Sequence, residues 1–196
     1  MYTFLILTLI IVFDESRVYN GKFTPKGNLY FCASQESIGV FNSSDPYDFK
    51  HINTIQGRNI RWTISSVDIT PDEEKLAYST LGPLIHIVDL YTLSKFHHWI
   101  DLRKLQNGDY SQTNFRCGGC KFSGDGNEIL AGSFCTGIAV FDLEKQFKTV
   151  SITNAHLDGI NSVWFANREN SHIIYTAADD WMVKVWDRRI LGIILY

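Results

Sequence analysis

One strand-turn-strand pattern occurs four times along the chain, and this repetition constrains the fold more than any other feature. Each copy begins with an apolar strand that runs into a short turn, at Phe23–Asn28, Ile69–Glu74, Phe122–Asn127 and Phe165–Asn170. Each copy ends in an apolar strand closed by an acid or an amide, at Phe41-Asn42, Val88-Asp89, Phe141-Asp142 and Trp186-Asp187. The proline, glycine and asparagine residues in the turns suit the backbone angles of tight hairpins.

The spacing of these landmarks is preserved although the copies differ in sequence. A turn and its ending lie 19 to 22 residues apart, and successive endings lie 45 to 53 residues apart. Repeats of about 40 to 45 residues with several short strands are typical of WD40 β-propellers. We therefore expect an all-β fold, a partial WD40 propeller of about four blades. The expected units are 17–60, 61–114, 115–155 and 156–189, between an apolar segment 1–16 and a short apolar tail 190–196 that does not continue the repeat.

The fourth unit contains residues from which a WD repeat builds a buried hydrogen-bond network. His156 precedes the first strand, Thr176 is the nearest hydroxyl on the second, Asp180 lies in the following turn and Trp186 on the third strand. Hydrogen bonds among these side chains satisfy polar groups that would cost about 1 to 3 kcal/mol each if buried unpaired. We expect their role to be structural.

Arg189 lies two residues after the end of the fourth unit, and we expect it to have no structural role inside the blade. Its planar guanidinium suits the pairing with a carboxylate of a partner protein. Arg189, Asp187, Trp186 and Asp180 are therefore the candidate binding residues. The alternative is that Asp187, Trp186 and Asp180 only stabilise the blade and that Arg189 is an ordinary exposed residue.

The composition argues against nucleic-acid and membrane partners. A net charge of −3 provides no basic surface for nucleic acid. The apolar run Thr3–Phe13 is shorter than the roughly 20 residues that span a membrane. No basic residue precedes this run and no small-residue cleavage site follows it, which favours an edge strand, or a start foreign to the repeat, over a signal peptide. Four cysteines within strand patterns indicate an intracellular protein of the nucleus and cytoplasm.

Several other side chains could be taken for reactive or metal-binding groups, but each has a simpler structural interpretation. Cys117 and Cys120 suggest a redox or zinc site, but they align with apolar strand positions of the other units, so a core role is favoured. His86 shares the register of Lys184 and is expected to be exposed. For the pair His97-His98, near Asp101, a solvated loop is favoured over a metal site. No nucleophile with a base, phosphate loop or carboxylate pair stands out. We expect a non-enzymatic chain with no metal and no cofactor.

The stretch Ile174–Arg189 resembles the DWD box of WD-repeat substrate receptors of cullin-4 RING ubiquitin ligases. Further stretches are similar to the DDB1-and-cullin-4-associated factor eleven family, also called WD-repeat protein twenty-three: Arg58–Asp72, Ile85–Ile87, Leu102-Arg103 after Asp101, and Ala155–Ala166. The resemblance covers about Arg17 to Arg189. Because that family has seven blades and four units are recognisable here, we expect this chain to be a fragment, a splice product or a partial gene model.

The resemblance implies a function in protein degradation. The propeller would bind the damaged-DNA-binding adaptor, and through it cullin-4, by the edge that bears Arg189. Another face would present an unidentified protein substrate for ubiquitination and proteasomal degradation, with ubiquitin transfer carried out by other subunits. The alternative is a general WD-repeat interaction scaffold without a ligase.

Overall fold

The described part of the chain folds into four sheets of antiparallel strands. The computed structural model describes residues 16–92, 97–104, 114–167, 169, 171–190 and 192–194. Within them the first sheet contains β1 (Asn20–Phe23), β2 (Leu29–Ala33), β3 (Ser37–Asn42) and β4 (Lys50–Gln56), and the second contains β5 (Ile64–Ile69), β6 (Lys75–Thr80), β7 (Leu84–Asp89) and β8 (His98–Asp101). The third contains β9 (Cys117–Phe122), β10 (Glu128–Ser133), β11 (Ile138–Asp142) and β12 (Phe147–Ile152), and the fourth β13 (Ile160–Phe165), β14 (Ile173–Ala178), β15 (Val183–Asp187) and β16 (Gly192–Ile194).

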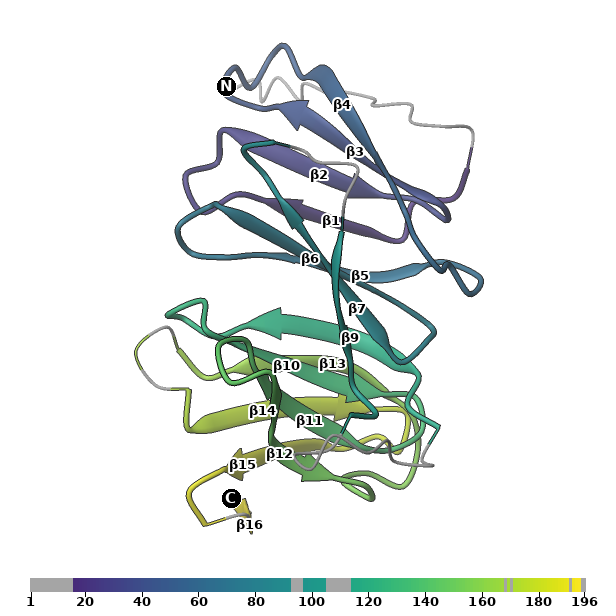
Figure 1. Ribbon diagram of the computed structural model, residues 1–196, viewed down its shortest axis with the longest axis vertical. Coiled ribbons are helices and arrows are strands. Elements are labelled where there is room, and N and C mark those ends of the chain that lie inside the picture. Colours follow the sequence, from purple (N-terminus) through teal and green to yellow (C-terminus); the bar gives the residue numbers. More distant parts are fainter. Residues whose placement is uncertain are drawn as a thin grey trace, which may run out of the picture.

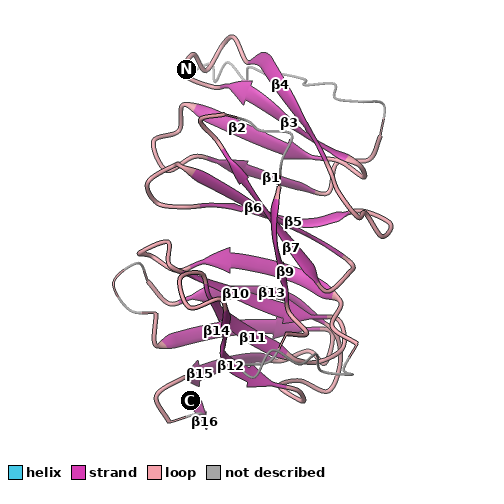
Figure 2. Cartoon of the chain, viewed as in Figure 1, coloured by secondary structure: helices cyan, strands magenta, loops and turns pink. Residues whose placement is uncertain are grey.

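The expected fold class, an all-β partial WD40 propeller, is confirmed (Figures 1 and 2). Strands follow one another across each sheet in sequence order, so each sheet is one blade of the propeller. The innermost strands β1, β5, β9 and β13 lie side by side in succession. Among the described residues, no helix has the length and apolar character needed to cross a membrane. The apolar run Thr3–Phe13 lies outside the described residues.

The end of the chain differs from the expectation. The segment 190–196 was expected not to continue the repeat, but β16 lies within it and pairs with β15, with Trp186 opposite Ile193. Without β16, the backbone groups of β15 on that side would form an unpaired sheet edge. The fourth blade therefore has the same four-strand order as the other three.

The turns between the first two strands of the first three blades follow the expected chemistry with one departure. The amides of Gly27, Glu73 and Gly126 each donate to the carbonyl three residues earlier, at 2.9 to 3.0 Å. Gly27 and Gly126 have φ of 75°, which suits glycine, but Glu73 adopts φ of 64° in the equivalent place. The Glu73 carboxylate accepts a hydrogen bond from the backbone amide of Lys26 at 2.6 Å, which ties this turn to that of the first blade.

Apolar side chains fill the spaces between adjacent blades. One buried cluster joins the first and second blades, another the second and third, and another the third and fourth. Small residues permit the close approach, because a Cβ at Gly132 would lie 2.6 Å from a Val163 methyl carbon and 2.7 Å from one of Ile160. The glycine on β10 thus allows the third blade to pack directly on β13.

Cys117 and Cys120 lie inside the cluster between the second and third blades. Both side chains are fully buried, and both thiols are free. Burial raises the pKa of Cys117 well above its usual value, with the neighbouring Cys120 adding to the effect, and burial raises the pKa of Cys120 to about 11. Because the thiolate is the form that attacks disulfides and binds metals, this environment favours the core role.

The prediction that His86 is exposed is wrong. The register is as expected, because Tyr78 stands opposite His86 as Thr176 stands opposite Lys184. The His86 side chain is nevertheless buried, stacked on Tyr78 with ring centroids 4.9 Å apart, because the second blade is covered on both faces. Burial, followed by the nearby charges of His97 and Arg58, lowers the pKa of His86 to about 4.

The neighbouring pair of histidines divides between two environments. His97 is half-buried, and a 2.8 Å hydrogen bond joins its Nδ1 to the Tyr78 hydroxyl, which corrects the expectation of a solvated loop. His98 begins β8 and is exposed, while Asp101 ends the same strand and pairs with Arg103. Among the described residues, no three histidine, cysteine or acidic side chains are grouped so as to hold a metal ion.

The outward face of the fourth blade exposes apolar side chains that internal blades bury. In β6 and β10 nearly every residue is buried, whereas in β14 buried and exposed residues alternate around Ile174 and Thr176. Tyr175 and Trp164 are 39% and 50% exposed, and Val183 is 72% exposed. Such a face favours association with another apolar surface.

We predict that the 196-residue chain self-associates through this face. Val183→Lys should reduce association in sedimentation velocity and change the free energy of unfolding by no more than about 0.5 kcal/mol, because the side chain is exposed. The matched control Val163→Lys places a charge in the buried cluster and should abolish cooperative unfolding in urea. Sedimentation of the unsubstituted chain as a compact monomer at all concentrations would contradict the prediction.

Candidate functional site

Four polar side chains of the fourth blade form a continuous hydrogen-bond network. His156 Nδ1 lies 2.9 and 3.0 Å from the two carboxylate oxygens of Asp180, and its Nε2 lies 2.6 Å from Thr176 Oγ1. The indole N–H of Trp186 donates to the same Thr176 oxygen at 2.9 Å. Since the carboxylate only accepts, the Nδ1–H of His156 donates to Asp180. The residues named from the sequence therefore lie together, and every polar atom between them has a partner.

Asp180 is held by backbone as well as side-chain donors. Its side chain is 3% exposed, and its oxygens accept from the amides of Leu157 at 3.0 Å and Met182 at 3.1 Å. Burial acts to raise the pKa of Asp180, but the Leu157 amide, the His156 ring and the Met182 amide together hold it below the usual value. Asp180 thus fixes the loop before β13 against the β14–β15 turn, and its carboxylate faces inward.

The acid or amide that ends each unit has a common local role. The side-chain oxygen accepts a backbone N–H of the following turn at 2.9 to 3.0 Å: Asn42 from Ser44, Asp89 from Thr92, Asp142 from Glu144, and Asp187 from Arg189. Short polar side chains at these positions replace the partner that the backbone loses where the strand ends. Asp187 is therefore first a turn-forming residue.

The expectation that Arg189 stands apart from the blade is wrong. Its Nε lies 2.9 Å from Asp187 Oδ1 and its Nη2 lies 2.5 Å from Asp187 Oδ2, so the guanidinium pairs with the carboxylate through two hydrogen bonds. The Asp187 side chain is 8% exposed, whereas that of Arg189 remains 59% exposed. The pair fixes the direction of the Arg189 side chain. Much of this side chain remains exposed, so a partner protein can contact it.

Arg188, which the sequence reasoning passed over, connects two blades. Its Nη1 and Nη2 donate to the two oxygens of Glu128 at 2.5 and 2.6 Å, and both side chains are about 85% buried, at 15% and 13% exposed. Glu128 begins β10 of the third blade. A basic residue after a strand-ending acid, with an acid at the start of a second strand, is too common a pattern to reveal this contact without the packing.

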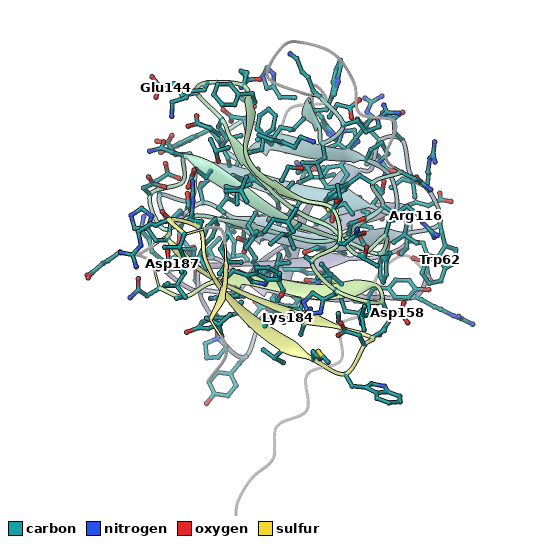
Figure 3. The ribbon with its side chains drawn as sticks, turned by 90° about the horizontal axis from the view of Figure 1, so that it is seen from below. Trp62, Arg116, Glu144, Asp158, Lys184 and Asp187 are labelled. Atoms are coloured by element: carbon teal, nitrogen blue, oxygen red, sulfur yellow. The ribbon has the colours of Figure 1, made fainter. Side chains whose placement is uncertain are left out.

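The turn that carries Asp187 lies at the end of the strands opposite to the loop that carries Asp158. In Figure 3, Asp187 and Glu144 lie toward one side of the molecule, and Trp62, Arg116 and Asp158 lie toward the other. A second pair of the same geometry occurs at the latter end, where Arg103 Nε and Nη2 donate to Asp101 at 2.9 and 2.6 Å. Leu102 there bonds to Pro83 in the β6–β7 turn.

Comparison with known proteins relates this chain to a group of longer proteins. It is 36% identical over 183 residues to the LEC14B protein of Lithospermum erythrorhizon, which covers 89% of this chain and 37% of that protein. It is 35% identical over 177 residues to the DDB1- and CUL4-associated factor 11 homolog of Caenorhabditis elegans, which covers 86% of this chain and 30% of that protein. The chain is homologous to part of the DDB1- and CUL4-associated factor 11 family.

The resemblance to the factor 11 family stated from the sequence is therefore confirmed. A similar match relates the chain to the LEC14B homolog of Prunus armeniaca, at 31% identity over 186 residues and 37% of that protein. No family model matches the chain. The chain spans about a third of the length of these relatives.

We predict that the network of the fourth blade contributes strongly to stability. Thr176→Val should lower the free energy of unfolding by roughly 2 to 4 kcal/mol, because it leaves the Trp186 N–H and His156 Nε2 buried without partners. Thr153→Val, at an exposed position, is the matched control and should stay within about 0.5 kcal/mol. Urea denaturation measures both, and equal stability of the two variants would show that the network is energetically neutral.

We also predict a loss of stability in acid that depends on Asp187. The Arg189 hydrogen bonds, against the opposing effect of burial, lower the pKa of Asp187 from 3.8 to about 2. Because the folded pKa lies below the unfolded one, this stabilisation is complete above about pH 4 and disappears as the pH falls through 2. Thermal denaturation from pH 6 to 2 should therefore show Asp187→Asn less stable than the unsubstituted chain near neutrality, with the difference shrinking in acid. A constant difference would contradict the assignment.

Proposed function

We propose that the chain is part of a substrate receptor of a cullin-4 RING ubiquitin ligase. The proposal rests on homology to proteins named as DDB1- and CUL4-associated factors and on the exposed Arg189 at the end of β15. In it, the damaged-DNA-binding adaptor contacts the Arg189 edge and connects the receptor to cullin-4. The receptor itself is not an enzyme, and it acts in the nucleus and cytoplasm.

The pairing of Arg189 with Asp187 supports a role for this edge in binding. A guanidinium that is already oriented loses less conformational freedom when a partner contacts it than a free side chain does. Two of its N–H groups are directed at Asp187, and the exposed remainder can donate to a carboxylate or a carbonyl of the adaptor. Asp187 holds the turn that carries Arg189, whereas Trp186 and Asp180 contribute indirectly, because they belong to the hydrogen-bond network that stabilises the blade.

The opposite end of the strands is the proposed substrate surface. It carries exposed aromatic residues, with Trp62 at 64% and Trp181 at 98% exposure, and Leu157 at 83%. Trp62 and Trp181 have φ of 78° and 65°, a backbone conformation that is costly for bulky residues and that is often retained at binding sites. A substrate held there for ubiquitination and degradation would leave the Arg189 edge free for the adaptor.

We predict that Arg189→Ala weakens binding of the purified adaptor roughly thirtyfold, the loss typical of an interfacial arginine. The matched control is Arg103→Ala, which removes an equivalent local pair with Asp101 at the other end of the strands and should leave adaptor affinity unchanged. Thermal denaturation of both variants separates lost stability from lost contact. Equal affinities of the two variants would sink the proposal, and no adaptor binding by the unsubstituted chain would favour the scaffold alternative.

A further inference from the structure

Four equivalent positions on the inner strands meet at one end of the array. Lys22 on β1, Asp68 on β5, Lys121 on β9 and Trp164 on β13 each precede the apolar residue that begins the first turn of their blade. Since β1, β5, β9 and β13 lie side by side, these four side chains form a row across the blades. They line a cavity of about 400 Å³ together with apolar residues that include Phe23, Pro25 and Pro71.

Asp68 provides the fixed centre of this row. Its side chain is 7% exposed, and its Oδ2 accepts from the Phe122 amide of the next blade at 2.9 Å. Its Oδ1 lies 2.9 Å from Lys22 Nζ and 3.5 Å from Lys121 Nζ. One carboxylate therefore lies between two ammonium groups, and the row carries one uncompensated positive charge.

Trp164 brings the two lysines to the same place. Lys22 Nζ lies 5.2 Å and Lys121 Nζ 5.0 Å from the centroid of the indole ring, so both contact its face by cation–π interactions. The ring is half exposed, whereas the lysine side chains are 29% and 17% exposed. Each ammonium group has three N–H donors, more than its contact with Asp68 uses. The unused donors are available to an acceptor in the cavity.

We propose that this cavity binds a carboxylate side chain of an acidic peptide segment. Two partly buried ammonium groups match an anion, and the exposed indole and the proline rim match the aliphatic stem and backbone of a peptide. The cavity is within the size range of ligand sites, about 300 to 1,000 Å³. If Asp68 served only to link neighbouring blades, one lysine would be sufficient. Here two lysines contact Asp68 and also lie over the half-exposed ring of Trp164.

Isothermal titration of the 196-residue chain with an acetylated and amidated Gly-Glu-Glu-Gly peptide tests the proposal, with Gly-Lys-Lys-Gly and inorganic phosphate as separate arms. The glutamate peptide should bind, and the lysine peptide should not. Lys22→Met keeps the aliphatic stem and should weaken binding at least tenfold. Lys50→Met, at an exposed lysine on β4, is the matched control and should change affinity less than twofold.

Trp164→Leu provides a second variant that leaves Asp68 paired, and it should also weaken binding. Thermal denaturation confirms that each variant is folded. Absence of binding, or affinity unchanged in both folded variants Lys22→Met and Trp164→Leu, would overturn the proposal, and phosphate binding more tightly than the peptide would overturn the peptide assignment. Arg189→Ala should leave peptide affinity unchanged, so this site and the proposed ligase role succeed or fail separately.

Discussion

The burial of both faces of a sheet between its neighbours is the interaction on which the rest of the structure depends. A four-stranded sheet with two apolar faces cannot satisfy them alone, and here each contact between blades supplies an apolar cluster. The residues of β6, in a blade packed on both faces, are almost all buried, whereas Val183, on the outward face of the fourth blade, is exposed. Packing between blades also positions the side chains of the inner strands, since these strands can align only when the blades stack closely.

Hydrogen bonds satisfy most of the buried polar side chains that the structure describes, although the two ring nitrogens of His86 have no such partner. In the fourth blade Thr176 links His156 to Trp186, whereas at the equivalent position of the second blade Tyr78 bonds to His97 and to the Arg58 amide. In both blades a hydrogen bond joins a side chain of the second strand to the segment that precedes the first strand. Different residue types thus serve the same need, because a buried donor or acceptor is costly whichever blade contains it.

The two proposed binding features use charge in different ways. In the turn after β15 the guanidinium of Arg189 pairs with the Asp187 carboxylate. This pair orients the arginine, and more than half of its side chain remains exposed to solvent. On the inner strands Lys22 and Lys121 exceed the single charge of Asp68, so positive charge remains inside a cavity. The first arrangement depends on one turn, and the second, which includes Trp164, requires all four described blades in register.

Local sequence determined the turns, the strand endings and the membership of the fourth-blade network, because these depend on spacing within about 35 residues and on short-range hydrogen bonding. It also indicated the repeat architecture and the family. The tertiary structure decided what lies on each side of a strand: His86 is buried because two blades enclose it, although its register matches Lys184. Packing also decided that Arg188 reaches Glu128 of the neighbouring blade and that Lys22, Asp68, Lys121 and Trp164 meet. These residues are far apart in the chain and carry no local pattern, so only the stacking of blades brings their charges together.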